Sequence, residues 1–115
     1  MKGWFELSLS KDKQYMFVLK AANSEVILVS ELYKQIESAE NGIESVRANC
    51  IDDNNFKRLT ASNGQAYFNL VAKNHEIIGT SEMYSSPQMR DKGIESVKTN
   101  GISVTVKNHL TKGSK

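Results

Sequence analysis

Several features that would point to particular classes of protein are missing or scarce in this chain of 115 residues. Cys50 is the only cysteine, so an intrachain disulfide is impossible and we expect a reduced thiol. The longest aliphatic run, from Val26 to Val29, is far too short to cross a bilayer. The N-terminal residues do not combine a basic start with an apolar stretch of signal-peptide length. We therefore expect a cytoplasmic protein that does not bind a membrane.

An excess of charge is also missing from most of the chain. The formal net charge is +2, but segment 107–115 contains three lysines and no acidic residue. Without these three, the 15 basic residues fall to 12, against 13 acidic ones. Proteins that bind phosphate groups of nucleic acids usually have a concentrated basic face. The sequence shows no such cluster, and nucleic-acid binding is therefore only an alternative.

Sequence motifs of catalysis and metal binding are absent as well. There is no glycine-rich phosphate loop and no nucleophile elbow. His75 and His109 have no second ligand at a metal-binding spacing, so we expect a solvated turn residue and a tail residue. Cys50 falls in the apolar phase of a helical pattern, which favours a buried thiol over a nucleophile. We predict no catalytic residue, no cofactor and no metal site.

What the chain does contain is a long internal repeat. Segment 17–49 recurs as segment 68–100 at a constant offset of 51 residues and without a gap, with 15 identities in 33 positions. Unrelated segments of ordinary composition would share roughly two. A period of this length indicates one supersecondary unit used twice.

The repeats are too short to be independent domains. Units of about 50 residues bury too little surface to be stable alone, so the halves are expected to share one core. We predict a single domain at 1–110, with repeats at about 3–53 and 54–106, followed by a basic, flexible tail at 107–115.

The pattern of apolar residues predicts three strands and a helix in each repeat. Residues alternate with period two over 4–9 and 14–22, which predicts a hairpin, and Val26–Val29 reads as a third strand. In the second copy, strands are expected at 56–61, 66–72 and 76–80, with Asn63-Gly64 as a hairpin turn. Segment 102–106 is predicted to be one extra strand.

The helices follow the third strands. An apolar stripe predicts the first helix; it consists of Ile36, Ala39, Ile43, Val46 and Cys50. Ser38 is a possible N-cap, and Asn49 is predicted to end this helix in the left-handed conformation. Ser86-Pro87 is a clear start for the second helix, and Asn100-Gly101 is its expected stop.

Both predicted helices contain an interior glycine, Gly42 or Gly93. Glycine costs about 1 kcal/mol relative to alanine inside a helix. Its presence in both copies predicts a close approach of each helix to the sheet or to the other helix. Together these patterns predict an α+β protein with one mixed, mainly antiparallel sheet and two helices on one face, built by tandem duplication.

Nearly the whole chain resembles the YegP-like family of small bacterial proteins of unknown function. The resemblance rests on the stretches 3–7, 17–21, 30–33, 42–47, 60–64 and 67–70, with Asn23, Glu25 and Asn49. It implies that each repeat is a β-β-β-α-β unit, and that the two merge into one sheet and exchange their closing strands. The sequence departs from the family at Ser24, where Asn-Gly is frequent. The resemblance implies no activity and no catalytic residues.

A hydroxyl, a carboxylate and a phenol precede each helix, and this is the strongest candidate for a functional site. The residues are Ser30, Glu31 and Tyr33 in the first copy and Ser81, Glu82 and Tyr84 in the second. They could line two pseudo-symmetric pockets in which helix N-termini bind an anion. The alternative is structural, because serine and glutamate satisfy backbone groups at bends and tyrosine closes a core edge.

The function expected from these features is non-catalytic. We predict an interaction module that binds a protein or a small molecule through the sheet surface or the repeat seam. An alternative is weak RNA or single-stranded nucleic-acid binding through the surface aromatics Trp4 and Tyr67 and the basic tail. An enzyme that uses the Ser-Glu-Tyr turns is a third possibility. We expect a monomer, with a dimer as the alternative.

Overall fold

The computed structural model describes residues 2–110, which form seven strands, two α-helices and one short 3₁₀ helix. The first repeat contains β1 (Trp4–Leu9), β2 (Tyr15–Lys20), β3 (Val26–Ser30) and α1 (Ile36–Asn49). The 3₁₀ helix η1 (Asp53–Asn55) leads into the second repeat. That repeat contains β4 (Phe56–Thr60), β5 (Ala66–Val71), β6 (Ile77–Thr80) and α2 (Pro87–Asn100), and β7 (Val106–Asn108) follows.

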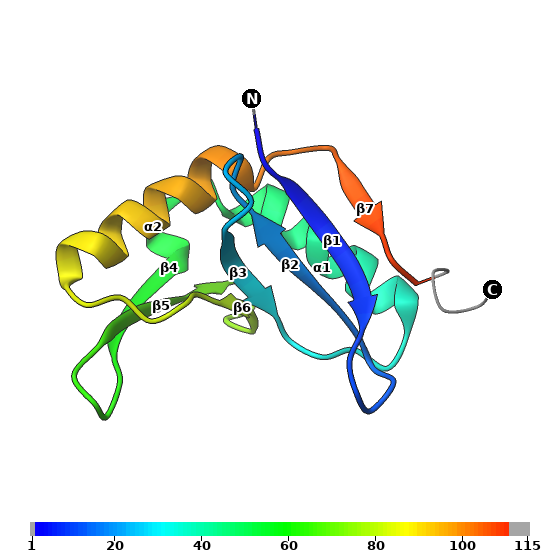
Figure 1. Cartoon of the computed structure of the whole chain (residues 1–115), viewed down its shortest axis with the longest axis horizontal. Helices are drawn as coiled ribbons and strands as arrows, with labels where there is room; N and C mark the ends of the chain where they lie inside the picture. The colour runs from blue at the N-terminus through cyan, green and yellow to red at the C-terminus, as the bar shows by residue number, and fades with distance from the viewer. Residues whose placement is uncertain (1, 111–115) are drawn as a thin grey trace.

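All seven strands form one sheet in the order β4-β5-β6-β3-β2-β1-β7. Every neighbouring pair is antiparallel except β1 and β7, which are parallel. Both helices cover the same face of this sheet (Figure 1). The α+β architecture and the merging of two repeats predicted from the sequence are therefore confirmed.

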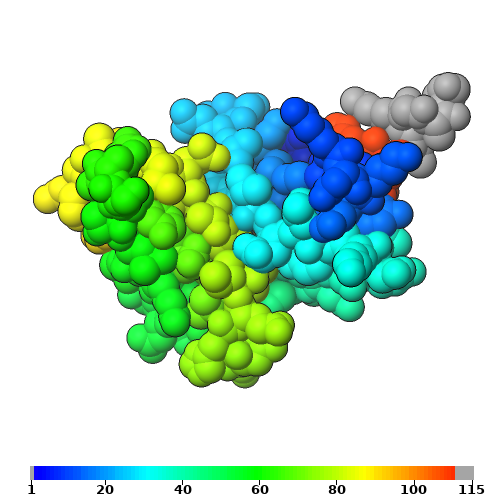
Figure 2. Space-filling model, turned by 90° about the horizontal axis from the view of Figure 1, so that it is seen from below, coloured from blue at the N-terminus to red at the C-terminus, as the bar shows by residue number. Residues whose placement is uncertain are grey.

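The two repeats meet where β3 pairs with β6. The ladder there is short and consists of Val29 opposite Thr80 and Ser30 opposite Gly79. Val29 and Thr80 are themselves equivalent residues, 51 positions apart, so an approximate twofold axis passes between them. Figure 2 shows the halves side by side, with the first repeat in blue and cyan and the second in green and yellow. We call the boundary between them the repeat seam.

One core serves both halves. Its largest fully buried side chains come from both repeats and include Phe5, Phe17, Leu19, Leu28, Phe68, Leu70 and Ile94. The aromatic packing is duplicated: the rings of Phe17 and Tyr33 stack with centroids 6.4 Å apart, and those of Phe68 and Tyr84 with centroids 6.5 Å apart. Cys50 is completely buried, as predicted from its helical phase.

The closing strand lies later in the chain than the sequence predicts. Segment 102–106 was expected to be a strand, but residues 101–105 form a connection and β7 begins at Val106. Lys107 and Asn108, assigned above to the tail, pair with β1 instead. The error arises because apolar residues at alternate positions are typical of a half-buried strand. Here two of them, Ile102 and Val104, are exposed in the connection instead. The rest of the predicted tail, 111–115, lies outside the described residues.

The predicted exchange of closing strands occurs at one edge of the sheet. β7 follows the second repeat and pairs with β1 of the first. Among residues 2–110, no separate strand closes the first repeat, because η1 leads directly into β4. At an offset of 51 residues, β7 corresponds to the start of β4. The two edges of the sheet are therefore different.

The helix ends differ from the expectation in detail. α1 begins two residues before Ser38, and its N-cap residue, Gln35, makes no side-chain capping bond. α2 starts as predicted, since the Ser86 side chain accepts a hydrogen bond from the Met89 amide and Pro87 is the first helical residue. Asn49 does not adopt the left-handed conformation. It is the last residue of α1, and its side-chain amide donates to the Ser45 carbonyl at 2.8 Å.

All four hairpin turns contain one residue with positive φ. Gly64 has φ +85°, and its counterpart Lys13 has φ +66°. Ser24, where the sequence departs from the family, has φ +75°, and its counterpart His75 has φ +69°. The turn geometry therefore survives the replacement of glycine, although non-glycine residues adopt this region at a cost.

Interior glycines in both helices face a tyrosine. A methyl group at Gly42 would lie 2.7 Å from Tyr33 Oη, and one at Gly93 would lie 2.7 Å from Tyr84 Cζ. The close approach predicted from the sequence is present. In both copies the contact is with the tyrosine that precedes the helix. In the first copy Phe17 of β2 is also close, so α1 approaches the sheet as expected.

Candidate functional site

The two serines of the Ser-Glu-Tyr turns are used by the backbone. Ser30 Oγ accepts a hydrogen bond from the Phe17 amide at 2.9 Å and donates one to the Glu31 carbonyl at 2.7 Å. Ser81 makes the same two bonds with Phe68 and with Glu82. Both serines are buried. Their hydroxyls hold the end of β3 or β6 in place, as in the structural interpretation of the sequence.

Glu31 and Tyr33 line the larger of two related pockets at the repeat seam. We call it the first seam pocket; its volume is about 730 Å³. Its wall combines the turn after β3, one side of α1 and the hairpin between β5 and β6. The lining residues that carry polar side chains are Glu31, Tyr33, Ser38, Asn41, Ser45, Asn74, His75 and Glu76.

Glu82 and Tyr84 line a second seam pocket of about 440 Å³, with Glu25, Val26 and Ile27. These five residues are the counterparts, 51 positions away, of Glu31, Tyr33, Glu76, Ile77 and Ile78. Each pocket therefore combines the turn of one repeat with the hairpin of the other. Neither pocket could be formed by a single repeat.

The electrostatics of both pockets are acidic. Each brings a glutamate from one repeat near a glutamate from the other, beside a tyrosine. Burial raises the pKa of Tyr33 above its ordinary value, and the charges of Glu31 and Glu76 raise it further. The pKa of Tyr84 is raised in the same way by burial and by Glu82 and Glu25. The phenols therefore remain protonated hydrogen-bond donors at neutral pH.

This charge does not suit the anion considered in the sequence analysis. Two carboxylates repel a negatively charged ligand, so the lining of this pocket favours a cation over an anion. The sequence analysis considered the anion without the second carboxylate, Glu76 or Glu25, which the fold brings to each pocket from the other repeat. Both occur among the 15 identities between the repeats, so the duplication itself was the available signal.

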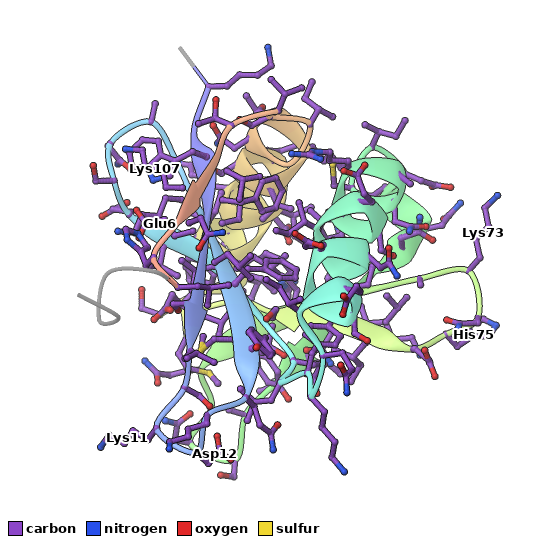
Figure 3. All side chains as sticks on the ribbon, turned by 90° about the vertical axis from the view of Figure 1, so that its right-hand side faces the viewer. Glu6, Lys11, Asp12, Lys73, His75 and Lys107 are labelled. Atoms are coloured by element: carbon purple, nitrogen blue, oxygen red, sulfur yellow. The ribbon has the colours of Figure 1, made fainter. Side chains whose placement is uncertain are left out.

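The first seam pocket has richer neutral chemistry than the second. Ser38 and Asn41 of α1 line it, whereas their counterparts in α2 are Met89 and Lys92. It also contains the exposed turn residue His75 (Figure 3), whose counterpart is Ser24. The two repeats have therefore diverged around a shared pair of acidic residues and a tyrosine.

The surface aromatics lie far apart in the sheet. Trp4 is on β1 and Tyr67 is on β5, with three strands between them. Trp4 Nε1 donates to Glu6 Oε2 at 2.7 Å, and Lys107 Nζ lies 4.1 Å from the centre of the indole ring. Because a lysine covers the ring and a carboxylate lies beside it, this arrangement disfavours stacking with a nucleic-acid base.

Glu6 is the centre of a cluster that links β7 to the sheet. Its carboxylate contacts Lys20 Nζ at 3.2 Å and His109 Nε2 at 3.2 Å, in addition to Trp4. Figure 3 shows Glu6 and Lys107 side by side. The pKa of Glu6 is lowered, chiefly by the hydrogen bond from Trp4. His109, expected to be a tail residue, is half-buried in this cluster.

Other candidate chemistry is weak in the part of the chain that the structure describes. The Cys50 thiol is buried, which raises its pKa and keeps it protonated. Within residues 2–110, no group of three side chains is arranged to hold a metal ion. Among the same residues, neither helix is long and apolar enough to cross a membrane.

Comparison with known proteins places the whole chain. A family model described as a domain of unknown function, DUF1508, matches twice, at residues 10–56 and 61–108. The UPF0339 protein YegP of Escherichia coli K12 is 58% identical over 109 residues, which cover 95% of this chain and 99% of YegP. A UPF0339 protein of Acinetobacter baylyi is 62% identical over 107 residues, which cover 93% of this chain and 96% of that protein.

Solved structures agree in fold. The solution structure of YegP from E. coli, described as a protein of unknown function, superimposes with a TM-score of 0.93 at 56% identity and covers 100% of this chain and 97% of YegP. That of a UPF0339 protein from Shewanella oneidensis superimposes with a TM-score of 0.92 at 51% identity and covers 98% of this chain and 96% of that one. The resemblance seen in the sequence is thereby confirmed, and the chain belongs to the UPF0339 family of YegP-like proteins with tandem DUF1508 repeats.

Proposed function

We propose that this protein is a non-catalytic interaction module that binds a small cationic ligand in the first seam pocket. The observation that carries the proposal is the repeated pairing of two carboxylates with a tyrosine at both seam pockets. The pair is formed only when the two repeats merge. The volume of about 730 Å³ lies within the range of ordinary ligand pockets.

The charges in this pocket support a cation. Glu31 and Glu76 form no ion pair within the described residues, so their charges are not compensated by a lysine or an arginine there. An ammonium or guanidinium group between them would form charge-assisted hydrogen bonds, which are stronger than neutral ones. The neutral groups of Ser38 and Asn41 would orient the rest of the ligand.

The hydrogen bonds of the turn argue against the enzymatic alternative. Ser30 Oγ donates its proton to a backbone carbonyl rather than to a base. A serine nucleophile requires an adjacent group that accepts its proton. Binding without chemistry is therefore the better-supported function.

The proposal can be tested by titrating ¹⁵N-labelled protein with spermidine and with L-argininamide at neutral pH, followed by amide NMR. We expect shifts at Tyr33 and at residues 74–78. Replacing Glu31 and Glu76 together by glutamine should weaken binding at this pocket by about tenfold or more, since hydrogen bonds to charged groups contribute about 1.5–3 kcal/mol each.

The duplication supplies a matched control. Replacing Glu25 and Glu82 by glutamine removes the same charges from the second seam pocket and should leave shifts at Tyr33 unchanged. Equal losses in the two double variants would indicate nonspecific attraction of cations. That result, or an absence of shifts with both probes, would contradict the proposal.

A further inference from the structure

The two edges of the sheet differ in a way that points to a second interaction surface. β4 and β7 are the outermost strands. Because Phe5 N donates to Thr105 O and His109 N donates to Leu7 O, alternate residues of β7 face β1. The backbone N–H and C=O groups of Val106 and Asn108 therefore point away from the sheet. No strand of the described chain lies beyond them.

A groove runs along the same edge on the helix side. Its volume is about 410 Å³, and its apolar lining is formed by Leu7, Ile43 and Val106. Glu40 and Glu44 lie on its rim with Arg47. Arg47 is ion-paired with Glu44 and donates to the Ser103 carbonyl at 2.7 Å. Glu40 forms no ion pair within the described residues, so the rim has a surplus negative charge. We call this cavity the edge groove.

The opposite edge is closed at the equivalent positions. The counterpart of Leu7 is Arg58, which bonds Asp53 and Asp91 at 3.2 Å each. Asp91 is the counterpart of Glu40, so ion pairs replace the groove. The Phe56 amide, whose counterpart pairs with β7, donates to the Asp53 carbonyl instead. Thus η1 satisfies a donor that would otherwise be free at this edge.

Charged side chains also protect β4 more than β7. Lysine and arginine on an edge strand discourage pairing with another chain. β4 carries Lys57 and Arg58, and both are exposed. The one lysine of β7, Lys107, lies against the ring of Trp4. The molecule therefore protects one edge and leaves the other open beside an apolar groove.

We propose that the β7 edge binds an extended segment of a partner protein as an additional strand, with an aliphatic side chain in the edge groove and a basic side chain beside Glu40. Strand addition draws affinity from main-chain hydrogen bonds and specificity from pockets for alternate side chains. The outward backbone N–H and C=O groups of Val106 and Asn108 would form the main-chain hydrogen bonds, and the edge groove would receive a side chain. The surplus charge of Glu40 selects a basic rather than an acidic neighbour.

The test uses the full-length protein and a short, capped peptide of alternating lysine and valine, followed by amide NMR. We expect shifts at residues 106–108, at Leu7 and at Ile43. A peptide of alternating lysine and serine should bind about tenfold more weakly, because burial of one valine side chain contributes roughly that factor. A lysine–valine peptide with alternate amides methylated should lose binding, since it cannot complete the strand pairing.

Two variants separate this site from other acidic surfaces. Glu40→Lys should weaken binding of the lysine–valine peptide severalfold, whereas Lys57→Glu on the closed β4 edge should leave the affinity for this peptide unchanged. Shifts confined to Tyr33 and residues 74–78 would assign the peptide to the seam pocket and overturn the inference. Undiminished binding of the methylated peptide, or no binding of the lysine–valine peptide, would overturn it as well.

Discussion

At the scale of single residues, the duplication shows which side chains are structural. Ser30 and Ser81 make identical hydrogen bonds, and Tyr33 and Tyr84 stack identically on phenylalanine. The carboxylates of Glu31 and Glu82, which lie between the serine and the tyrosine in the sequence, make no comparable bonds to the backbone. Structure therefore explains why the serine and the tyrosine are identical in the two repeats: the serine bonds the backbone and the tyrosine packs in the core. It does not explain why Glu31 and Glu82 are identical.

The contact between Gly93 and Tyr84 leads to a stability prediction. Gly93→Ala should destabilise the protein by about 1 kcal/mol. Overpacking costs typically 1–3 kcal/mol, which exceeds the gain in helix propensity of about 1 kcal/mol. The three atoms nearest to the added methyl group all belong to Tyr84. In a Tyr84→Phe background the penalty should therefore shrink. Chemical denaturation of the four proteins measures both effects.

Gly64→Ala is the control for this experiment. Gly64 has φ +85° and open space around it, so alanine there is strained without touching a neighbour. Gly64→Ala should destabilise the wild-type protein and the Tyr84→Phe variant to the same extent. A higher melting temperature for Gly93→Ala would show that the helix can move away from the ring.

At the scale of secondary-structure elements, β7 is the least firmly held strand. It has three residues, all of them exposed, and it forms the one parallel pairing in the sheet. The cluster around Glu6 compensates with contacts to His109 and with Lys107 over the neighbouring indole. The docking of β7 should therefore depend on the charge of Glu6.

The lowered pKa of Glu6 gives this dependence a sign. A carboxyl group with a lower pKa in the folded state stabilises the fold above its unfolded pKa, and the contribution is lost as pH falls through the folded value. We expect the melting-temperature difference between wild type and Glu6→Gln to be largest near neutral pH. It should shrink as pH falls below 4.5, the ordinary glutamate value.

The measurement is a series of thermal unfolding curves for both proteins between neutral pH and pH 3. Amide shifts of residues 106–109 should move with the same titration. A melting-temperature difference that stays constant across this range would show that the charge of Glu6 does not hold β7.

At the scale of the whole molecule, the repeats depend on each other. The ladder between β3 and β6 has only two residue pairs, but each helix packs against strands of both halves. α1 contacts β2 of its own repeat and β5 and β6 of the other, and α2 contacts β5 of its own repeat and β2 and β3 of the other. The shared core, rather than the backbone ladder, therefore holds the halves together.

This dependence predicts the behaviour of a single repeat. Residues 54–115 alone should be unfolded at low concentration and should fold only as a dimer. Each copy would need a second copy to complete the hydrophobic core, and its closing strand would need the β4 edge of that second copy. Circular dichroism and sedimentation over a wide concentration range test this expectation. A cooperatively folded monomer at the lowest concentration would contradict it.

The sequence by itself determined the elements and their duplication. Alternation and short aliphatic runs placed six strands within one or two residues at most boundaries, and the Ser86-Pro87 pair placed the start of α2, because these signals act between residues close in the chain. The position of β7 was missed because short alternating segments pair wherever an edge is available, and the edge belongs to a strand about 100 residues earlier. α1 begins at Ile36, the first residue of the predicted apolar stripe, whereas the possible cap at Ser38 is not used; the N-cap residue Gln35 makes no capping bond that would mark the start in the sequence.

Only the tertiary structure decided the character of the candidate site. Glu31 and Glu76 belong to different repeats, and local patterns contain no information about which side chains meet across a seam. The same holds for the edge groove, where Leu7, Ile43 and Val106 come together from three elements. Long-range packing follows from how the apolar faces of all elements are buried at once. The sequence therefore predicted that two equivalent turns exist, whereas the fold determined that each is acidic and that the two sheet edges differ.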